Sequence, residues 1–221
     1  MTFSVLARDP DTGAIGGAAA TGSLCVGGWV LRGDLEAGMS ASQGAAPSTF
    51  WGEDVLVAMH NGISAAEAVE SITAADGGRA YRQLAALDLT GQTGAFTGES
   101  NEPEKGSREF TNGVVSGNML ARTDVLDAMV REFTSVSGSF EDRLLATLRA
   151  ATLEGGDYRG LLSAALLVLK PDEPPLTLRV DHHPSDPIGA LEDLYQKATA
   201  GDYAKWTSKV PVAVDRERTF D

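Results

Sequence analysis

The sequence predicts an α+β domain in which two antiparallel sheets face each other and helices cover their outer sides, giving a four-layer αββα sandwich. The predicted elements run as strands, two helices, strands, two helices, strands and one helix, an order unlike the strict alternation of a parallel doubly wound sheet. Glycine contributes 25 of the 221 residues, as in chains with many short strands and tight turns. The apolar run at 161–169 indicates a strand covered on both faces. An α+β domain with a single sheet fits the same pattern.

The first predicted elements form a hairpin. The apolar side chains of Phe3, Val5 and Ala7 recur with a period of two, which is typical of a strand with one buried face. Residues 9–13, Asp-Pro-Asp-Thr-Gly, are strong turn formers, and residues 14–20 return as the second strand. The same reasoning predicts further strands at residues 26–31, 38–43, 82–87, 93–97, 109–117, 161–169 and 176–180, with an exposed polar loop at 101–108.

Capping residues predict where the helices begin. Ser64 with Glu67 forms a capping box, Thr123 is positioned to cap a helix, and Ser139 is followed by Asp142 at the third helical position. The helices are expected at residues 50–60, from 64 to the glycines at 77–78, and at 124–133, 140–153 and 187–200. Residues 1–221 are expected to form one domain, with 203–221 as an extended C-terminal tail.

Charge and composition exclude several classes of partner. The chain has 18 basic and 31 acidic residues, so its net charge is −13, and a surface this negative repels nucleic acid and anionic membranes. No apolar run approaches the roughly 20 residues that span a bilayer, and the first residues lack the pattern of a signal peptide. Cys25 is the only cysteine, which excludes an intrachain disulfide and a cysteine metal cage. We therefore expect a cytoplasmic protein without a metal or cofactor.

Common catalytic motifs are missing. The sequence has no phosphate-binding loop, no dinucleotide fingerprint and no Gly-x-Ser-x-Gly elbow. His182 and His183 are adjacent on a predicted extended segment, so their side chains point to opposite sides, and we interpret them as surface residues rather than metal ligands.

Thr2 is the candidate nucleophile. Removal of Met1 would expose a threonine with a free α-amine, and this amine can take the hydroxyl proton without any histidine. A threonine that opens the first strand of a glycine-rich two-sheet domain is well placed for this chemistry. A Met-Thr start also arises by chance in many chains, so a purely structural Thr2 is the alternative.

Nine segments together resemble a bacterial and archaeal family known only as domain of unknown function 1028. They occur in the order of the family and lie at residues 2–9, 12–13, 42–43, 64–67, 82–83, 96–98, 117–121, 155–160 and 163–168. The resemblance implies an Ntn-hydrolase-like αββα sandwich but no established activity. The chain departs from the family where Ala46 precedes Pro47, because the family usually has an asparagine there.

The resemblance also suggests roles for residues in the matched segments. In a hydrolase of this type Asn118 would donate to the negative oxygen of the reacting carbonyl, although a turn-stabilising role fits equally. Arg82 would hold a substrate carboxylate or pair with Asp157, and we favour the pairing. With Thr2 and Asn118 as catalytic residues, the expected site includes Gln43, Arg82 and Asp157 as substrate-binding residues.

Two functions follow from this site. The first is hydrolysis of an amide-type bond in a small molecule, with Thr2 as nucleophile. The alternative is a non-catalytic protein that binds a small ligand and retains the fold. A weaker third reading is a structural assembly subunit, and association as a homodimer is expected in any of these cases.

Overall fold

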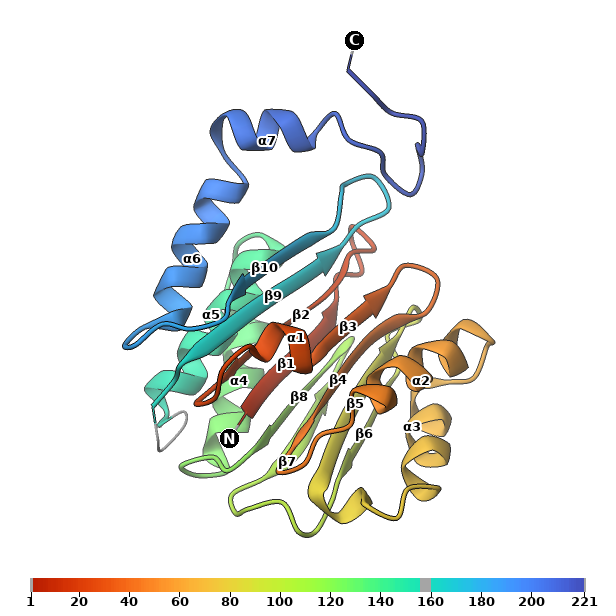
Figure 1. The fold of residues 1–221 in the computed structure, drawn as a ribbon, viewed down its shortest axis with the longest axis vertical. Helices are drawn as coiled ribbons and strands as arrows, with labels where there is room; N and C mark the ends of the chain where they lie inside the picture. Colours follow the sequence, from red (N-terminus) through yellow and green to blue (C-terminus); the bar gives the residue numbers. More distant parts are fainter. Residues whose placement is uncertain (1, 156–159, 221) are drawn as a thin grey trace.

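The structure is a computed structural model that describes residues 2–155 and 160–220. It contains two antiparallel sheets (Figure 1). The six-stranded sheet has the order β10-β9-β2-β1-β8-β7 and the four-stranded sheet has the order β3-β4-β5-β6. The predicted arrangement of two facing antiparallel sheets is therefore confirmed, and the single-sheet alternative is wrong.

The strands of the six-stranded sheet come in three pairs, from the start, the middle and the later part of the described chain. They are β1 (Thr2–Arg8), β2 (Ile15–Thr21), β7 (Gly106–Phe110), β8 (Gly113–Asn118), β9 (Ser163–Leu169) and β10 (Leu176–Val180). Those of the four-stranded sheet are β3 (Leu31–Asp34), β4 (Gly38–Gly44), β5 (Arg82–Asp88) and β6 (Thr93–Thr97). Strand β1 is central and pairs with β2 and β8 along its whole length, so Thr2 lies opposite Thr21 on one side and Asn118 on the other.

Most of the helices form the two outer layers, whereas the short helix at Val26–Trp29 contributes Val26 to the core between the sheets. The helices are α1 (Val26–Trp29), α2 (Thr49–His60), α3 (Ala65–Ala74), the 3₁₀ turn η1 (Arg79–Tyr81), α4 (Asp124–Ser135), α5 (Phe140–Leu153), α6 (Pro187–Ala198) and α7 (Gly201–Thr207). Helices α2 and α3 pack on the four-stranded sheet, and α4, α5 and α6 pack on the six-stranded sheet (Figure 1). The order of layers is helix, sheet, sheet, helix.

Strand alternation separates the core into layers. Phe3, Val5 and Ala7 pack against the helices, whereas Leu6 faces the other sheet and joins the core between the sheets. That middle core is apolar toward the end of β1 and polar at its start, where Thr2 and Ser4 occupy the equivalent inward positions. The polar end of the space between the sheets holds the candidate site.

Four sequence-based expectations need correction. Residues 26–31 contain α1 and the first residue of β3 instead of one strand. The expected loop at 101–108 ends at residue 105, and the strand expected at 109–117 is a hairpin of β7 and β8 that begins at Gly106 and turns at Asn112, whose φ is 62°. Thr123 precedes α4 but its side chain makes no capping bond, unlike Ser64 and Ser139. The last predicted helix stops at Ala198, and α7 occupies the first part of the tail expected at 203–221.

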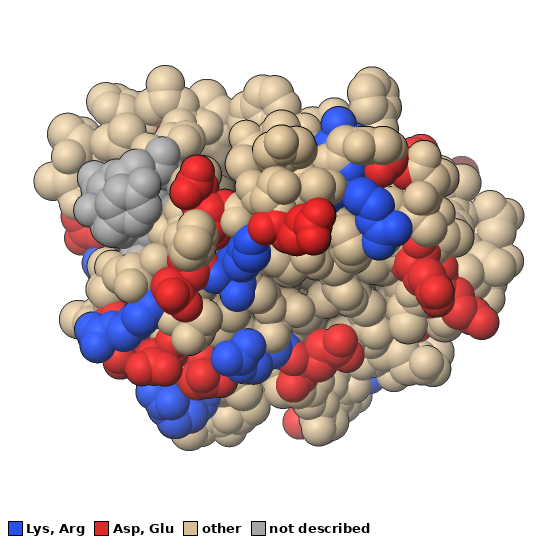
Figure 2. All heavy atoms as spheres, turned by 90° about the horizontal axis from the view of Figure 1, so that it is seen from below, with Lys and Arg blue, Asp and Glu red and all other residues tan. Residues whose placement is uncertain are grey.

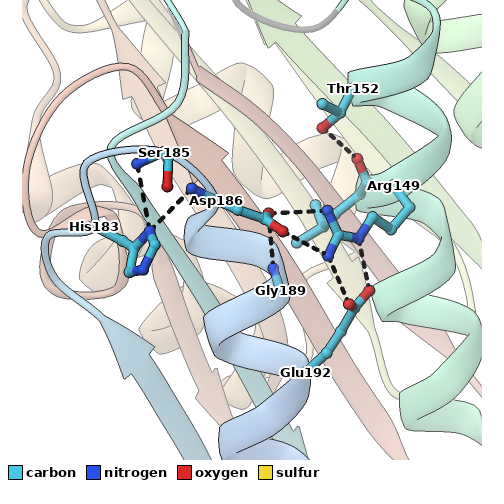
Figure 3. A network of polar contacts seen from close by, with 8 residues as sticks. Arg149, Thr152, His183, Ser185, Asp186, Gly189 and Glu192 are labelled. Carbon is cyan, nitrogen blue, oxygen red and sulfur yellow. Dashed lines mark hydrogen bonds and ion pairs between the residues drawn. The ribbon is translucent and has the colours of Figure 1, made fainter.

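An ion-pair network joins α5 to the start of α6 (Figure 3). Arg149 of α5 donates to both oxygens of Asp186, the N-cap of α6, at 2.9 and 3.1 Å, and to Glu192 at 2.9 and 2.7 Å. Hydrogen bonding to Glu192 raises the pKa of Arg149, and the bond from Arg149 lowers the pKa of Asp186. Asp186 also accepts from Gly189 N, so one carboxylate caps α6 and holds it against α5.

Candidate functional site

A cavity of about 430 Å³ lies where β1 begins, between the ends of the two sheets. Its polar lining includes Thr2 and Thr21 from the six-stranded sheet and Gln43 from the four-stranded sheet. Apolar side chains supply much of the rest of the wall: Leu24, Val26, Trp29, Val30, Ala45, Pro47 and Met119. The size and the mixed lining are typical of a small-molecule site.

Thr2 and the hydrogen-bond partner of its hydroxyl, Thr21, both line this cavity. Thr2 is half-buried, and its Oγ1 donates to Thr21 Oγ1 at 3.1 Å. Thr21 Oγ1 also accepts from Ser23 N at 3.3 Å. The first strand therefore presents its threonine to a hollow lined by other hydroxyl groups, instead of to sealed packing.

A buried amide network lies directly behind Thr2. Gln83 Oε1 accepts from Gln43 Nε2 at 2.7 Å and from Asn118 Nδ2 at 3.1 Å. Gln83 Nε2 is close to three acceptors, Thr97 Oγ1 at 2.8 Å and the carbonyl oxygens of Gly106 and Gly117 at 3.0 Å each. Since Gln83 is fully buried on β5 and Asn118 ends β8, the network ties the two sheets together.

Gln43 belongs to both the network and the cavity. Its Oε1 accepts from Ser4 Oγ at 2.9 Å, and its Nε2 reaches Thr2 O at the long distance of 3.4 Å. The side chain is therefore oriented by three partners on β1 and β5. The bond to Thr2 O is the weakest of them because it is near the outer limit of hydrogen-bond length.

Backbone conformation at the cavity is unusual. Cys25 and Met119 have φ angles of 60° and 56°, in the left-handed region that non-glycine residues rarely adopt. Met119 lines the cavity, and Cys25 lies between the lining residues Leu24 and Val26. Such conformations cost about 1–2 kcal/mol each and are typically retained at functional sites.

The cavity contains no charged side chain among its described lining residues. Among the described residues, the titratable groups with shifted pKa values lie elsewhere, around α5, α6 and the end of β9. Burial raises the pKa of Tyr195, and the pKa of Lys170 is raised by Glu141 and Glu173 although burial alone would lower it. Figure 2 shows the end of the molecule where β1 begins, and acidic and basic side chains alternate across it without forming a patch of one sign.

The structure brings together three of the five residues expected at the site. Thr2 and Gln43 line the cavity, and Asn118 is next to Thr2 in the sheet but is buried behind it. Arg82 is not in this cavity. Asp157 lies outside the described residues.

Arg82 instead lies on the side of the four-stranded sheet that faces α2 and α3. Its guanidinium pairs with Asp76, donates to Ala46 O at 3.1 Å and stacks over the ring of Trp51 at 5.7 Å. Arg82 does pair with an acid, as expected, but its described partner is Asp76, whereas Asp157 was the expected one. These contacts place Arg82 near the loop at 45–47, and it lines a different surface cavity, beside Trp51 and Asp76.

Sequence reasoning missed Gln83, Thr21 and Trp29. Gln83 has a readable signal, since it occupies the inward position that Ala85 and Leu87 continue along β5. A polar residue at an inward strand position indicates a buried hydrogen-bond network. Trp29 had no such signal, because the residues around it were expected to form a strand.

No described helix has the length and apolar composition that a bilayer crossing needs. The described residues also contain no group of three or more histidine, cysteine, aspartate or glutamate side chains with the geometry to hold a metal ion.

The fold and cavity define an α+β protein with two facing antiparallel sheets and a small-molecule-sized site between them. The family model described as "Family of unknown function (DUF1028)" matches residues 2–191. The chain belongs to this family, as the sequence resemblance indicated.

A solved structure is very similar to this chain. The crystal structure of a protein from Silicibacter pomeroyi, described as a member of the same DUF1028 family, has a TM-score of 0.97 and 64% sequence identity. The alignment covers 100% of this chain and 96% of that one. A search of curated proteins found no significant match.

Proposed function

We propose that this protein hydrolyses an amide-type bond in a small molecule, with Thr2 as the nucleophile after removal of Met1. The observation that carries the proposal is the position of Thr2, which lines a cavity without any charged side chain among the described lining residues and whose Oγ1 bonds to Thr21, another lining residue. The α-amine of a processed Thr2 would supply the base that the described wall lacks.

The reaction balances with this residue alone. The Thr2 amine takes the proton of Oγ1 as the oxygen attacks the substrate carbonyl, and it returns that proton to the departing nitrogen when the C–N bond breaks. The resulting ester between Thr2 and the acyl group is then cleaved by water, again with the amine as base. The α-amine has an ordinary pKa of roughly 8, so a useful fraction is neutral at physiological pH.

The test is a screen of small amides and ureides, with products identified by mass spectrometry. Thr2→Ala removes the hydroxyl and is expected to abolish turnover, whereas Thr2→Ser keeps a hydroxyl on the same atom and is expected to remain active. The N-terminal mass of the active protein is expected to correspond to a chain that begins at Thr2. An active sample in which every molecule retains Met1 would exclude the amine-base mechanism.

Ligand binding without turnover is the second candidate function. It is favoured by Asn118, which is 1% exposed and donates to Gln83 instead of lining the cavity. This function predicts that a small metabolite raises the melting temperature, is recovered unchanged and gives the same shift with Thr2→Ala. Recovery of a cleaved product would decide for the hydrolase.

A further inference from the structure

We infer that the substrate of this cavity is an uncharged carboxamide with an apolar group, whose carbonyl oxygen accepts from Gln43 and whose apolar group packs on Trp29. The inference rests on the proposed function and adds to it the class of substrate, its orientation and the residues that select it.

The absence of charge from the described wall selects against ionic substrates. An ion that enters a cavity without a partner of opposite charge loses hydration that nothing replaces, and this costs several kcal/mol. The described lining offers hydroxyl groups and one amide but no carboxylate or guanidinium. The Thr2 amine of the proposed mechanism acts as a base only in its neutral form, so the reactive state of this wall carries no charge either. A neutral compound with a few hydrogen-bonding atoms suits such a wall best.

Gln43 supplies the donor for the carbonyl oxygen. One of its Nε2 hydrogens is used in the 2.7 Å bond to Gln83. The other points toward Thr2 O at 3.4 Å, a bond long enough to be exchanged for a better acceptor beside the Thr2 hydroxyl. Ser4 and Gln83 fix which end of the amide is the donor, because Ser4 Oγ donates to Oε1 at 2.9 Å.

This arrangement gives Gln43 the task first assigned to Asn118. Asn118 Nδ2 donates to Gln83, and its residue does not line the cavity. Gln43 does line the cavity and reaches the residue that carries the nucleophile. A carbonyl oxygen held by Gln43 would gain a stronger bond as it becomes negative during attack.

The apolar wall defines the other half of the substrate. Trp29 is 51% exposed and Leu24 is 54% exposed, and both belong to the lining. Two large, half-exposed apolar side chains in one cavity offer an apolar ligand a surface on which to pack, since burial of apolar area is favourable. The hydroxyl of Thr2 belongs to β1 and the amide of Gln43 to β4, whereas Trp29 belongs to the short helix α1. The wall therefore offers a substrate separate polar and apolar regions.

Three probes of one size test the charge preference. The titrations are run at pH 9, where most of an α-amine with a pKa of roughly 8 is neutral. At this pH phenylacetamide is neutral, phenylacetate is an anion and 2-phenylethylamine is mostly a cation. Dissociation constants are measured by ligand-detected NMR titration in 0.15 M salt, which screens the attraction of cations to a protein of net charge −13. Phenylacetamide is expected to bind at least tenfold more tightly than either ion. Equal or tighter binding of an ion, or no binding of phenylacetamide, would overturn the inference.

Two tryptophans provide a matched pair of variants. Trp29 and Trp206 are 51% and 50% exposed, and only Trp29 lines the cavity. Trp29→Ala is expected to weaken phenylacetamide binding at least fivefold, and Trp206→Ala, on α7, is expected to leave it unchanged. The same effect from both variants would refute the assigned orientation.

Gln43→Glu tests the polar end. A carboxylate at this position has no N–H to donate, so a folded variant is expected to lose at least tenfold in affinity for phenylacetamide, and unchanged affinity would refute the role of Gln43. Circular dichroism shows whether the variant folds, and the tryptophan pair decides the inference if it does not.

The titrations are repeated with Thr2→Ala, which keeps the cavity but removes the nucleophile. If phenylacetamide still binds more tightly than the two ions but no amide is turned over, the assigned ligand class is supported and the proposed hydrolysis is refuted. If Thr2-dependent turnover is found only with charged amides, hydrolysis stands and the substrate class fails.

Discussion

Gln83→Met is the substitution that most directly tests the amide network between the sheets. Methionine has nearly the length of glutamine but lacks its hydrogen-bonding atoms. The change leaves the donors of Gln43 and Asn118 without their acceptor, and it strips a donor from the carbonyl oxygens of Gly106 and Gly117. Each buried group left without a partner costs about 1–3 kcal/mol, so a loss of about 4 kcal/mol in the free energy of unfolding is expected.

Urea denaturation followed by circular dichroism measures this loss, and thermal denaturation provides a second reading. For a chain of this length about 4 kcal/mol corresponds to a fall in Tm of about 8–16 °C. Gln196→Met is the matched control, because Gln196 is exposed on α6 and its substitution is expected to change stability by less than about 0.5 kcal/mol. If Gln83→Met lost less than about 1 kcal/mol, the network would not be a main link between the sheets.

Three further predictions concern caps, a carboxylate and a turn. Ser139→Ala removes a capping box and is expected to lower the free energy of unfolding by about 1 kcal/mol. Thr123→Ala changes a position without a capping bond and is expected to alter that free energy by less than about 0.5 kcal/mol. Equal losses of the two variants in urea titrations would contradict this prediction. The bond from Arg149 lowers the pKa of Asp186 in the folded state. The stabilisation that this ion pair provides is therefore present above the unfolded pKa of about 4 and is lost as the pH falls through the lower folded pKa. Asp186→Asn is expected to remove this part of the acid dependence of Tm, and an unchanged profile of Tm against pH would argue against the pair. Gly38→Ala is expected to be far more destabilising than Gly13→Ala. Both glycines have positive φ, but only a Cβ at Gly38 would overlap a backbone atom, the carbonyl oxygen of Leu87. Similar melting temperatures of the two variants would refute the role assigned to this close approach.

The sequence predicted most strands and the capped helices because each carries a strong local signal. Ser64 and Ser139 form their capping boxes, and the period of two at Phe3, Val5 and Ala7 correctly identifies the face of β1 that packs on the helices. The errors occur where tertiary contacts override propensity. Residues 26–29 have the small and β-branched composition of a strand, yet they form one helical turn in which Val26 N donates to Ser163 Oγ, 137 positions away.

The candidate site was harder to predict than the fold. Thr2 could be selected from its place in the chain, but the partners of Arg82 could not, because an arginine in an acidic chain has many carboxylates within reach. The residues that surround Thr2 come from β2, β4 and α1, which are brought together only by the facing of the two sheets. Such a set can be identified only from the three-dimensional packing. Gln83 is the exception, because its inward position on β5 can be recognised in the sequence.

The central position of β1 has a practical consequence for work on this protein. Thr2 is paired in register on both sides and lines the cavity, so a peptide fused directly to it would begin beside the cavity. An affinity tag at that end would obstruct ligands and prevent exposure of the threonine amine. The C-terminus lies at the far end of the molecule (Figure 1), so expression vectors with a C-terminal tag suit the assays proposed above.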